Sequence, residues 1–337
     1  MYRLLIVGGG SIGERHLRCF LKTGRVTASV CDNRPARLKE LAALYNVAST
    51  HASFDDIDLS KFDAVVICVY ADLHVPWGLR AVEAGAHVLI EKPLSTGLAG
   101  INELETAADK RQRVVGVAHV RRAQSDAIAV KKELDSGRIG QALSLTCLVG
   151  YDHRMTRPDY LSTYWTRRAT GGGAVLDMSS HTSNYAQWLL GPVTSVTAAY
   201  DHLQMEGTPC EDTLSYVLRF RNSPAMATIH CSAWQAHRCN LLMIAGTKGS
   251  IVCDAVEGRM GTVDRENRWQ WVEGLAGKTD SKGQNDEPFI RQAANFLDAV
   301  EDKAPILCSL AEGKHTIEIC SATYESGQRR AEVIIPP

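Results

Sequence analysis

The sequence predicts an α/β protein in which a doubly wound parallel sheet of the Rossmann type is followed by a second α/β domain with a mainly antiparallel sheet. Strand and helix signals alternate through the first 120 residues, and a glycine-rich loop at 8–13 follows the first strand. Clear apolar–polar alternation begins only beyond residue 190. A βαβα order implies parallel strands, whereas alternation indicates a sheet with one face packed on helices.

The first domain is predicted from short apolar runs separated by segments with helical spacing. The run at 64–69 is apolar without alternation, as expected of a parallel strand covered on both faces. The predicted strands are 2–7, 26–31, 64–69, 87–90 and 113–117, and the predicted helices are 12–23, 35–45, 76–84 and 97–110. We place the boundaries of this nucleotide-binding domain at 1–121.

The remaining residues, 122–337, are predicted to form a substrate-binding and oligomerisation domain, with its C-terminal helix free to pack back on the first domain. Residues 254–285 are expected to form hairpins and a polar loop. The other predicted elements are helices at 123–134, 176–190, 288–301 and 311–328, and strands at 143–150, 193–200, 213–221, 225–233 and 241–246.

The bulk composition excludes several classes of function. The formal net charge is −1, so no global field attracts nucleic acid or an anionic membrane. No apolar run approaches the roughly 20 residues that span a bilayer. Met1 leads directly into the first strand, and none of the ten cysteines forms a C-x-x-C pair, so we expect a cytoplasmic protein without a leader peptide. Neither the histidines nor the cysteines have metal-site spacing, and no metal is expected.

The glycine loop is the first motif that carries chemistry. Gly8, Gly10 and Gly13 fit the G-x-G-x-x-G pattern between a predicted strand and a predicted helix. The first glycine makes the turn, the second admits a pyrophosphate, and the third allows close packing of helix on strand. Ser11 and Ile12 begin the helix, whose free N–H groups favour phosphate. The loop therefore predicts a bound dinucleotide.

The identity of the dinucleotide is predicted from the end of the second strand. Asp32 stands about twenty residues after the last glycine, where a carboxylate accepts hydrogen bonds from the adenosine ribose. The same carboxylate repels a 2′-phosphate, which favours NAD. Arg34 lies two residues further on and is able to pair with such a phosphate, so NADP stays open as an alternative.

The segment around Glu91, Lys92 and Pro93 resembles that of a known family. The resemblance is to glucose–fructose oxidoreductase, inositol dehydrogenase and the rhizopine-catabolism proteins, the Gfo/Idh/MocA family. It extends over nearly the whole chain and rests on GGGSIGERH at 8–16, DAVVICVYADLHVPW at 63–77, GAHVLIEKPLS at 85–95, RIGQ at 138–141, GGGAVLDMSSH at 171–181 and AGTKGSI at 245–251. The EKP segment and the GGG-x-x-x-D-x-x-x-H segment, in this order, are the specific part.

The resemblance implies a Rossmann domain, an α/β domain with an open-faced sheet that often carries the oligomer contact, and an active site between them. We accordingly expect a homodimer or homotetramer. The implied activity is hydride transfer between NAD(P) and a hydroxyl or ketone of a sugar, a polyol or a sugar derivative. It also implies that Tyr70, His74 and Glu91 line the cofactor, with Glu91 on the nicotinamide ribose. His119 stands where the family often has Asn near the nicotinamide.

Three residues are predicted to be catalytic. Lys92 follows a parallel strand, at the sheet edge where ligands bind, and its ammonium is suited to stabilise the reacting oxygen. The peptide bond between Lys92 and Pro93 is often cis in the family. Asp177 and His181 are spaced i, i+4 on a predicted helix and share one face. We assign His181 as general base, and Asp177 as the group that orients it and contacts the substrate.

Four further residues are candidate substrate contacts. Arg154 and Arg167 lie in the loop at 151–168, where arginine forks suit an acidic or nucleotide-linked sugar, although the residues favour solvated arginines on a surface loop over this interpretation. Trp165 precedes the glycine run at 171–173, one residue out of register with the Trp-Arg pair of the family. Asn184 replaces an Asp found in many members, so it contacts substrate or packs a helix.

Two alternative functions remain consistent with the sequence. One is a sugar enzyme of the glycosidase or epimerase type that retains NAD and catalyses no net oxidation. The other is a non-catalytic dinucleotide-binding regulator. The presence of Lys92, Asp177 and His181 favours the dehydrogenase over the regulator.

Overall fold

The computed structural model describes residues 1–275 and 285–336, so part of the polar loop predicted at 254–285 lies outside the described residues. The chain forms two compact units, each described here by itself. The first comprises residues 1–123 and 285–314, and the second comprises 124–275 and 315–336. Residues 285–314 therefore belong with the first unit, whereas the sequence analysis placed them in the second domain.

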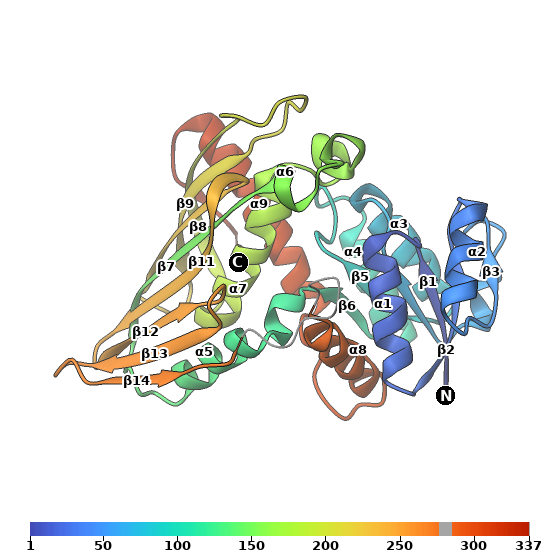
Figure 1. Cartoon of the computed structure of the whole chain (residues 1–337), viewed down its shortest axis with the longest axis horizontal. Helices are drawn as coiled ribbons and strands as arrows, with labels where there is room; N and C mark the ends of the chain where they lie inside the picture. Colours follow the sequence, from blue (N-terminus) through green and yellow to red (C-terminus); the bar gives the residue numbers. More distant parts are fainter. Residues whose placement is uncertain (276–284, 337) are drawn as a thin grey trace. The chain divides into compact units, whose positions relative to one another are not determined.

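The first unit contains a six-stranded parallel sheet with helices on its faces, which confirms the predicted Rossmann-type fold (Figure 1). The strand order is β3-β2-β1-β4-β5-β6. The strands are β1 (Tyr2–Val7), β2 (Val26–Cys31), β3 (Thr50–His51), β4 (Ala64–Ile67), β5 (His87–Glu91) and β6 (Val115–Ala118). The helices are α1 (Ser11–Lys22), α2 (Pro35–Leu44), α3 (Ala71–Glu83), α4 (Ile101–Arg111) and α8 (Glu287–Val300), with short 3₁₀ turns η1 (Leu59–Lys61) and η2 (Val120–Ala123).

Apolar burial explains both the sheet and the position of α8. All four residues of β4 are buried, as a strand covered on both faces requires. Helix α8 carries the apolar positions Phe289, Ala293 and Phe296 on one face. The Phe296 ring meets the edge of Phe20 in α1, with ring centroids 6.1 Å apart. These rings share one core cluster with the strands, and this contact between distant segments brings residues 285–314 into the first unit.

Helix α3 begins earlier than the sequence predicted. The sequence analysis began this helix at Pro76, and proline is favoured at the first helical position. In the structure the helix starts at Ala71, so Pro76 lies inside it and removes one helical hydrogen bond. Ala71, His74 and Val75 are buried in that first part of the helix. Their tertiary packing outweighs the local preference of proline.

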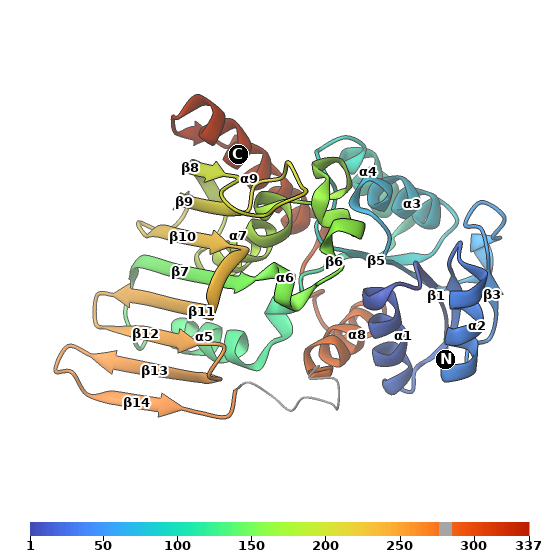
Figure 2. The ribbon, with the colours of Figure 1, turned by 45° about the horizontal axis from the view of Figure 1, so that its top comes forward.

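The second unit contains a nine-stranded sheet in the order β14-β13-β12-β11-β7-β10-β9-β8-β15 (Figure 2). Only β7 and β10 are parallel neighbours, so the sheet is mainly antiparallel as predicted. The strands are β7 (Ala142–Asp152), β8 (Val193–Asp201), β9 (Thr213–Phe220), β10 (Met226–Ser232), β11 (Trp234–Gly246), β12 (Gly249–Asp254), β13 (Arg259–Asp264), β14 (Trp269–Val272) and β15 (Val333–Ile334).

Helices cover one face of this sheet (Figure 1). They are α5 (Ser125–Asp135), α7 (Ser180–Leu190) and α9 (Leu310–Arg329). Burial alternates along the strands. In β11, for example, Leu242 and Ile244 are buried, whereas Leu241 and Met243 are exposed. Within the described part of this unit, no helix covers the opposite face, which is the open-faced arrangement that was expected.

The loop between β7 and α7 consists of short turns. They are α6 (His153–Thr156), the 3₁₀ turns η3 (Tyr160–Ser162), η4 (Tyr164–Thr166) and η5 (Arg168–Thr170), and a π-helical turn (Val175–Ser179) that runs directly into α7. Helical turns of the π type occur frequently at functional sites. In the described ranges, no helix is both long and apolar enough to cross a membrane.

An ion-pair cluster joins the start of α8 to α1. The Asp286 carboxylate accepts hydrogen bonds from the Arg18 guanidinium at 2.7 and 2.8 Å and from the Lys22 ammonium at 3.0 Å. Arg15 adds a contact at 3.3 Å. The hydrogen bonds from Arg18 hold the pKa of Asp286 well below its ordinary value. This cluster therefore stabilises the folded state while Asp286 is ionised.

We expect Asp286→Asn to lower the free energy of unfolding at pH 7 by about 1–3 kcal/mol, the usual range for hydrogen bonds to a charged group. A lowered pKa stabilises the fold above the unfolded-state pKa of about 3.9, so the difference from the native chain should persist to about pH 5 and shrink below it. Denaturant titrations across this pH range measure the effect. The exposed neighbour Glu287→Gln is the control, and a pH-independent difference would contradict this explanation.

Candidate functional site

The predicted cofactor residues follow the strands of the parallel sheet. The glycine loop 8–13 follows β1, Asp32 follows β2, Tyr70 lies just beyond β4, Lys92 follows β5 and His119 follows β6. Because the strands are parallel, these residues share the carboxyl edge of one sheet. The strand order reverses between β1 and β4, and ligands of such sheets bind in the crevice at that point.

The glycine loop leaves no room for a side chain at Gly13 but leaves open space at Gly10. A Cβ atom on Gly13 would lie 1.7 Å from the carbonyl oxygen of Gly8, so only glycine permits this packing. A Cβ atom on Gly10 would meet no protein atom within 4 Å, which leaves open space where a pyrophosphate is expected. Gly10 also precedes α1 without a side-chain cap for its first N–H groups. The loop thus fits the phosphates of a dinucleotide.

Asp32 is buried and closely tied to the glycine loop. Its Oδ2 accepts the Gly9 N–H at 2.7 Å, and its two oxygens accept the Arg34 Nε and Nη2 at 2.8 Å each. Burial raises the pKa of Asp32, but the hydrogen bonds from Arg34 and Gly9 outweigh it and lower the pKa overall. Arg37, which the sequence analysis missed, donates to the Gly9 carbonyl at 2.6 Å. The loop backbone is therefore held at both polar groups of Gly9.

The other predicted cofactor residues differ in exposure. Tyr70 is exposed, whereas Glu91, His74 and His119 are buried. The Glu91 carboxylate lies 2.7 Å from Nε2 of His16 in α1, another residue that the sequence analysis did not single out. The only sequence signal for His16 was its place on the buried face of the helix that follows the glycine loop.

Lys92 is half-buried directly after β5. The Lys92–Pro93 peptide bond is cis, as the resemblance implied. Lys92 belongs to the first unit, whereas Asp177 and His181 belong to the second.

Asp177 lies on the π-helical turn and is buried. Its Oδ1 accepts the Tyr164 hydroxyl at 2.8 Å, and its Oδ2 accepts the Trp165 indole N–H at 3.3 Å. Trp165 is part of the core of the second unit and stacks on His153 with ring centroids 4.9 Å apart. His181 follows on α7, four residues after Asp177. The structure therefore brings Asp177 and Trp165 together and adds Tyr164, which the sequence analysis missed.

A second buried carboxylate, that of Glu211, contacts the backbone of the same turn. Glu211 accepts the Val175 N–H at 3.1 Å and the Tyr324 hydroxyl at 2.8 Å. Arg168 pairs with Glu211 at 2.7 Å from the exposed side. The sequence contains no local signal for Glu211, because its partners lie 36 to 113 residues away in the chain.

Two of the remaining predicted substrate contacts interact with other protein side chains, and the third is exposed. The Asn184 amide donates to Thr316 of α9 at 3.0 Å, which is a helix–helix contact. Arg154 pairs with Asp152 at 2.8 Å and lies over the Trp234 ring, with its guanidinium carbon 3.3 Å from the ring centroid. Arg167 is exposed.

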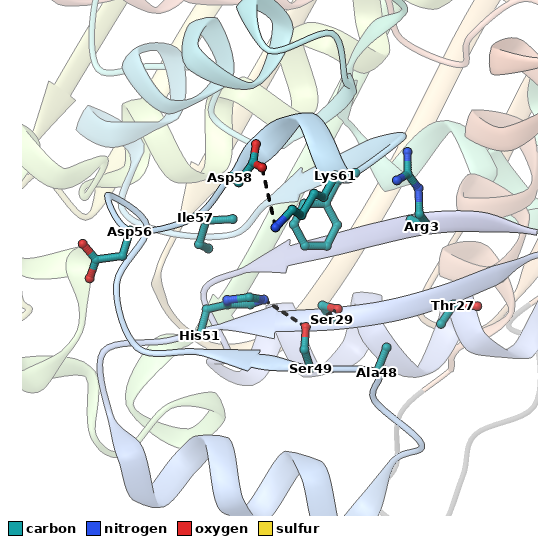
Figure 3. Close-up of a pocket in the computed structure, with 11 residues that line it drawn as sticks. Arg3, Thr27, Ser29, Ala48, Ser49, His51, Asp56, Ile57, Asp58 and Lys61 are labelled. Atoms are coloured by element: carbon teal, nitrogen blue, oxygen red, sulfur yellow. Dashed lines mark hydrogen bonds and ion pairs between the residues drawn. The ribbon is translucent and has the colours of Figure 1, made fainter.

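A separate cavity of about 380 Å³, lined mostly by residues with polar side chains, opens beside β1, β2 and β3 (Figure 3). Its polar side chains contact one another, since Lys61 pairs with Asp58 at 3.6 Å and Ser49 lies 2.9 Å from the His51 ring. None of the predicted site residues lines this cavity. In the part of the chain that the structure describes, no three His, Cys, Asp or Glu side chains are grouped as a metal site requires.

Both units contain residues that match models of known protein families. Residues 2–119 match the oxidoreductase family with an NAD-binding Rossmann fold, and residues 128–252 match the GFO/IDH/MocA C-terminal domain. Inositol 2-dehydrogenase of Rhizobium meliloti (strain 1021) is 30% identical over 345 residues, which cover 99% of both chains. Inositol 2-dehydrogenase 2 of Saccharopolyspora erythraea is 33% identical over 193 residues, and the alignment spans 55% of this chain and 53% of that relative.

The fold also has close counterparts among solved structures. Levoglucosan dehydrogenase, solved with NADH and levoglucosan, superposes with a TM-score of 0.87 at 20% identity and covers 100% of both chains. At this identity the similarity concerns the fold.

We expect Asp32→Ala to weaken NADH binding by about tenfold, the cost of losing a hydrogen bond to a charged acceptor. NADPH should lose less, because removing the carboxylate also removes its repulsion of the 2′-phosphate. Fluorescence titration of NADH and NADPH measures both dissociation constants. Asp109→Ala, on an exposed face of α4, is the control. Equal losses for the two cofactors, or a larger loss for NADPH, would contradict the proposed preference.

Proposed function

The chain belongs to the GFO/IDH/MocA family of NAD-binding oxidoreductases, and on that premise we propose that it is a dehydrogenase or reductase acting on a CH–OH group. Its substrate is a sugar, a polyol or a sugar derivative, and NAD is preferred over NADP. The observation that carries the proposal is the position of Lys92, which follows β5 at the same sheet edge as the glycine loop and Asp32. The named activities of relatives on inositol and levoglucosan support the substrate class.

The proposed chemistry divides between three side chains. When bound, NAD supplies the hydride acceptor. His181 takes the proton of the substrate hydroxyl as general base, and Lys92 stabilises the charge that grows on the same oxygen. Asp177 orients His181 and contacts the substrate. Reduction uses the same groups in reverse, with His181 donating the proton.

The geometry around Asp177 supports its role as an orienting group. Each of its oxygens accepts one hydrogen bond, from Tyr164 and from Trp165. A carboxylate held from two sides keeps one position, as an active-site group must. Tyr164 and Trp165 thereby contribute to the proposed site without needing to touch the substrate.

We also propose that the protein forms a homo-oligomer through the open face of the nine-stranded sheet. Leu241 and Met243 of β11 and Met226 of β10 point to this face. On β14, Trp269 and Trp271 stack with centroids 4.9 Å apart and remain more than 40% exposed. Exposed apolar side chains that point to one sheet face favour association, and a second copy offers the same side chains.

We place the protein in the cytoplasm. All ten cysteines are free thiols and are buried. Free thiols are typical of a reducing compartment.

We expect Lys92→Ala and His181→Ala each to lower kcat at least about 100-fold while NADH still binds, because general acid–base and charge stabilisation contribute factors of this size. NADH formation on a panel of sugars, sugar acids, polyols and nucleotide sugars measures turnover, and a fluorescence titration measures binding. Lys110→Ala, on the exposed face of α4, is the matched control. Near-normal turnover in either site variant would refute the assignment.

We expect Met243→Glu to reduce the oligomeric state, because a charge at the centre of the open face opposes burial against a second copy. Sedimentation velocity of the native chain and the variant measures this. Leu44→Glu makes the same kind of change at an exposed position of α2 and should leave the native assembly intact. A monomeric native chain, or an unchanged assembly in Met243→Glu, would overturn the proposal.

A further inference from the structure

One face of α2 contacts the backbone of the glycine loop. Arg37 and Leu41 are spaced i, i+4 on this helix, so their side chains lie on the same face. The Arg37 Nε donates to the Gly9 carbonyl at 2.6 Å. A Cβ atom on Gly9 would lie 2.8 Å from a methyl group of Leu41, so the helix packs closely on the loop at this point. Helix α2 therefore holds the loop by one polar and one apolar contact.

The Arg37 guanidinium is itself fixed by two carboxylates. Its Nη2 donates to Oε2 of Glu14 in the first turn of α1, and its Nη1 pairs with Glu40 at 2.7 Å. The other oxygen of Glu14 accepts the Tyr45 hydroxyl at 2.8 Å. Burial and the hydrogen bond to Glu14 raise the pKa of Tyr45 to about 12, so this hydroxyl remains a donor at neutral pH. The side chains of Arg37 and Glu14 are only 16% and 17% exposed, and each of the three guanidinium nitrogens has a partner.

The hydrogen bond to the Gly9 carbonyl determines where the next N–H group of the loop points. The peptide between Gly9 and Gly10 is trans, so its C=O and N–H groups point in opposite directions. Because the carbonyl is turned toward Arg37, the N–H of Gly10 is turned away from α2. Gly10 is the second glycine of the motif, at which the backbone approaches the pyrophosphate. The contact from Arg37 thus fixes the direction of a backbone donor at the place where the phosphates are expected.

The preceding peptide of the loop is fixed by a side chain of opposite charge. The buried Asp32 accepts the Gly9 N–H at 2.7 Å, so two successive peptide planes each have a side-chain partner. Glycine backbones populate many conformations, and a loop of three glycines needs such partners to keep one of them. A loop that already has its bound conformation loses less conformational entropy when a ligand binds, and its affinity is higher for that reason.

We infer that Arg37, anchored by Glu14, is a positioning residue for the dinucleotide: it orients the glycine loop toward the pyrophosphate and acts through the loop backbone. The inference deepens the proposed function, because it rests on dinucleotide binding at the glycine loop. It does not depend on the catalytic assignment of Lys92. The pyrophosphate is common to NAD and NADP, so the contribution of Arg37 is the same for both cofactors, in contrast to that expected of Asp32.

The first test is Arg37→Met, which keeps an unbranched side chain but removes its donors. We expect the dissociation constants for NADH and NADPH to rise by the same factor, at least about tenfold, while kcat at saturating cofactor stays within about twofold. Lys39→Met, at an exposed position of the same helix, is the matched control. A folded Arg37→Met variant with native NADH affinity would overturn the inference, because Arg37 would then stabilise only the fold. A much larger loss for NADPH would also overturn it, because it would indicate direct contact with the 2′-phosphate.

Two further variants separate orientation of the loop from simple charge, and they keep the inference testable if Arg37→Met does not fold. Arg37→Lys retains the positive charge but lacks the planar fork. Glu14→Ala removes a negative charge from the first turn of α1, which by charge alone would strengthen phosphate binding. We expect each variant to raise the NADH dissociation constant at least about threefold. Native affinity in Arg37→Lys, or an equal or lower dissociation constant in Glu14→Ala, would overturn the inference.

Binding and turnover of the native chain, measured in parallel, separate this inference from the proposed function. A native chain that does not bind NADH would overturn both. If the native chain binds NADH and the Arg37 variants bind it equally well, only the inference fails. If the Arg37 variants lose affinity as expected while Lys92→Ala keeps its turnover, the catalytic assignment fails and the inference stands.

Discussion

The parallel pairing of β1 with both β2 and β4 is the constraint on which the candidate cofactor site depends. Parallel strands end at the same edge, so the glycine loop, Asp32 and Lys92 share one edge of the sheet although they are spread over some eighty residues of sequence. The close packing of Gly13 on Gly8 then places the first N–H groups of α1 at that edge. A side chain at Gly13 would displace α1, and with it both the phosphate loop and His16.

The carboxylates of the candidate site follow a common design. Asp32, Glu91, Asp177 and Glu211 are all buried, and each accepts hydrogen bonds from donors on both of its oxygens. A buried charge without partners would cost several kcal/mol, whereas several donors offset that cost and hold the carboxylate in a single position. In each case the donors come from a different segment than the carboxylate or from a turn beside it. Each of these groups therefore connects a candidate site residue to the packing of its own unit.

The two faces of the nine-stranded sheet in the second unit have different surroundings. The face under α5, α7 and α9 carries the core, with Leu242, Ile244 and Ile229 among its buried residues. The opposite face carries Met243 and the stacked Trp269 and Trp271. Strand alternation creates both faces at once, because successive side chains point to opposite sides. The same pattern therefore supports the unit's own core and the association surface proposed for it.

The sequence by itself determined the local elements whose structure depends on neighbouring residues. The strands at Tyr2–Val7 and Val26–Cys31 were predicted with their observed bounds, because most of their residues are apolar and buried, as expected of strands inside a parallel sheet. The glycine loop and Asp32 were found because their spacing reflects the geometry of a single βαβ unit. Only the tertiary structure decided that Glu91 meets His16, that Tyr164 and Trp165 hold Asp177, and that α8 belongs to the first unit. These contacts join residues 12 to 276 positions apart, and no pattern of neighbouring residues records which distant side chains a fold will bring together.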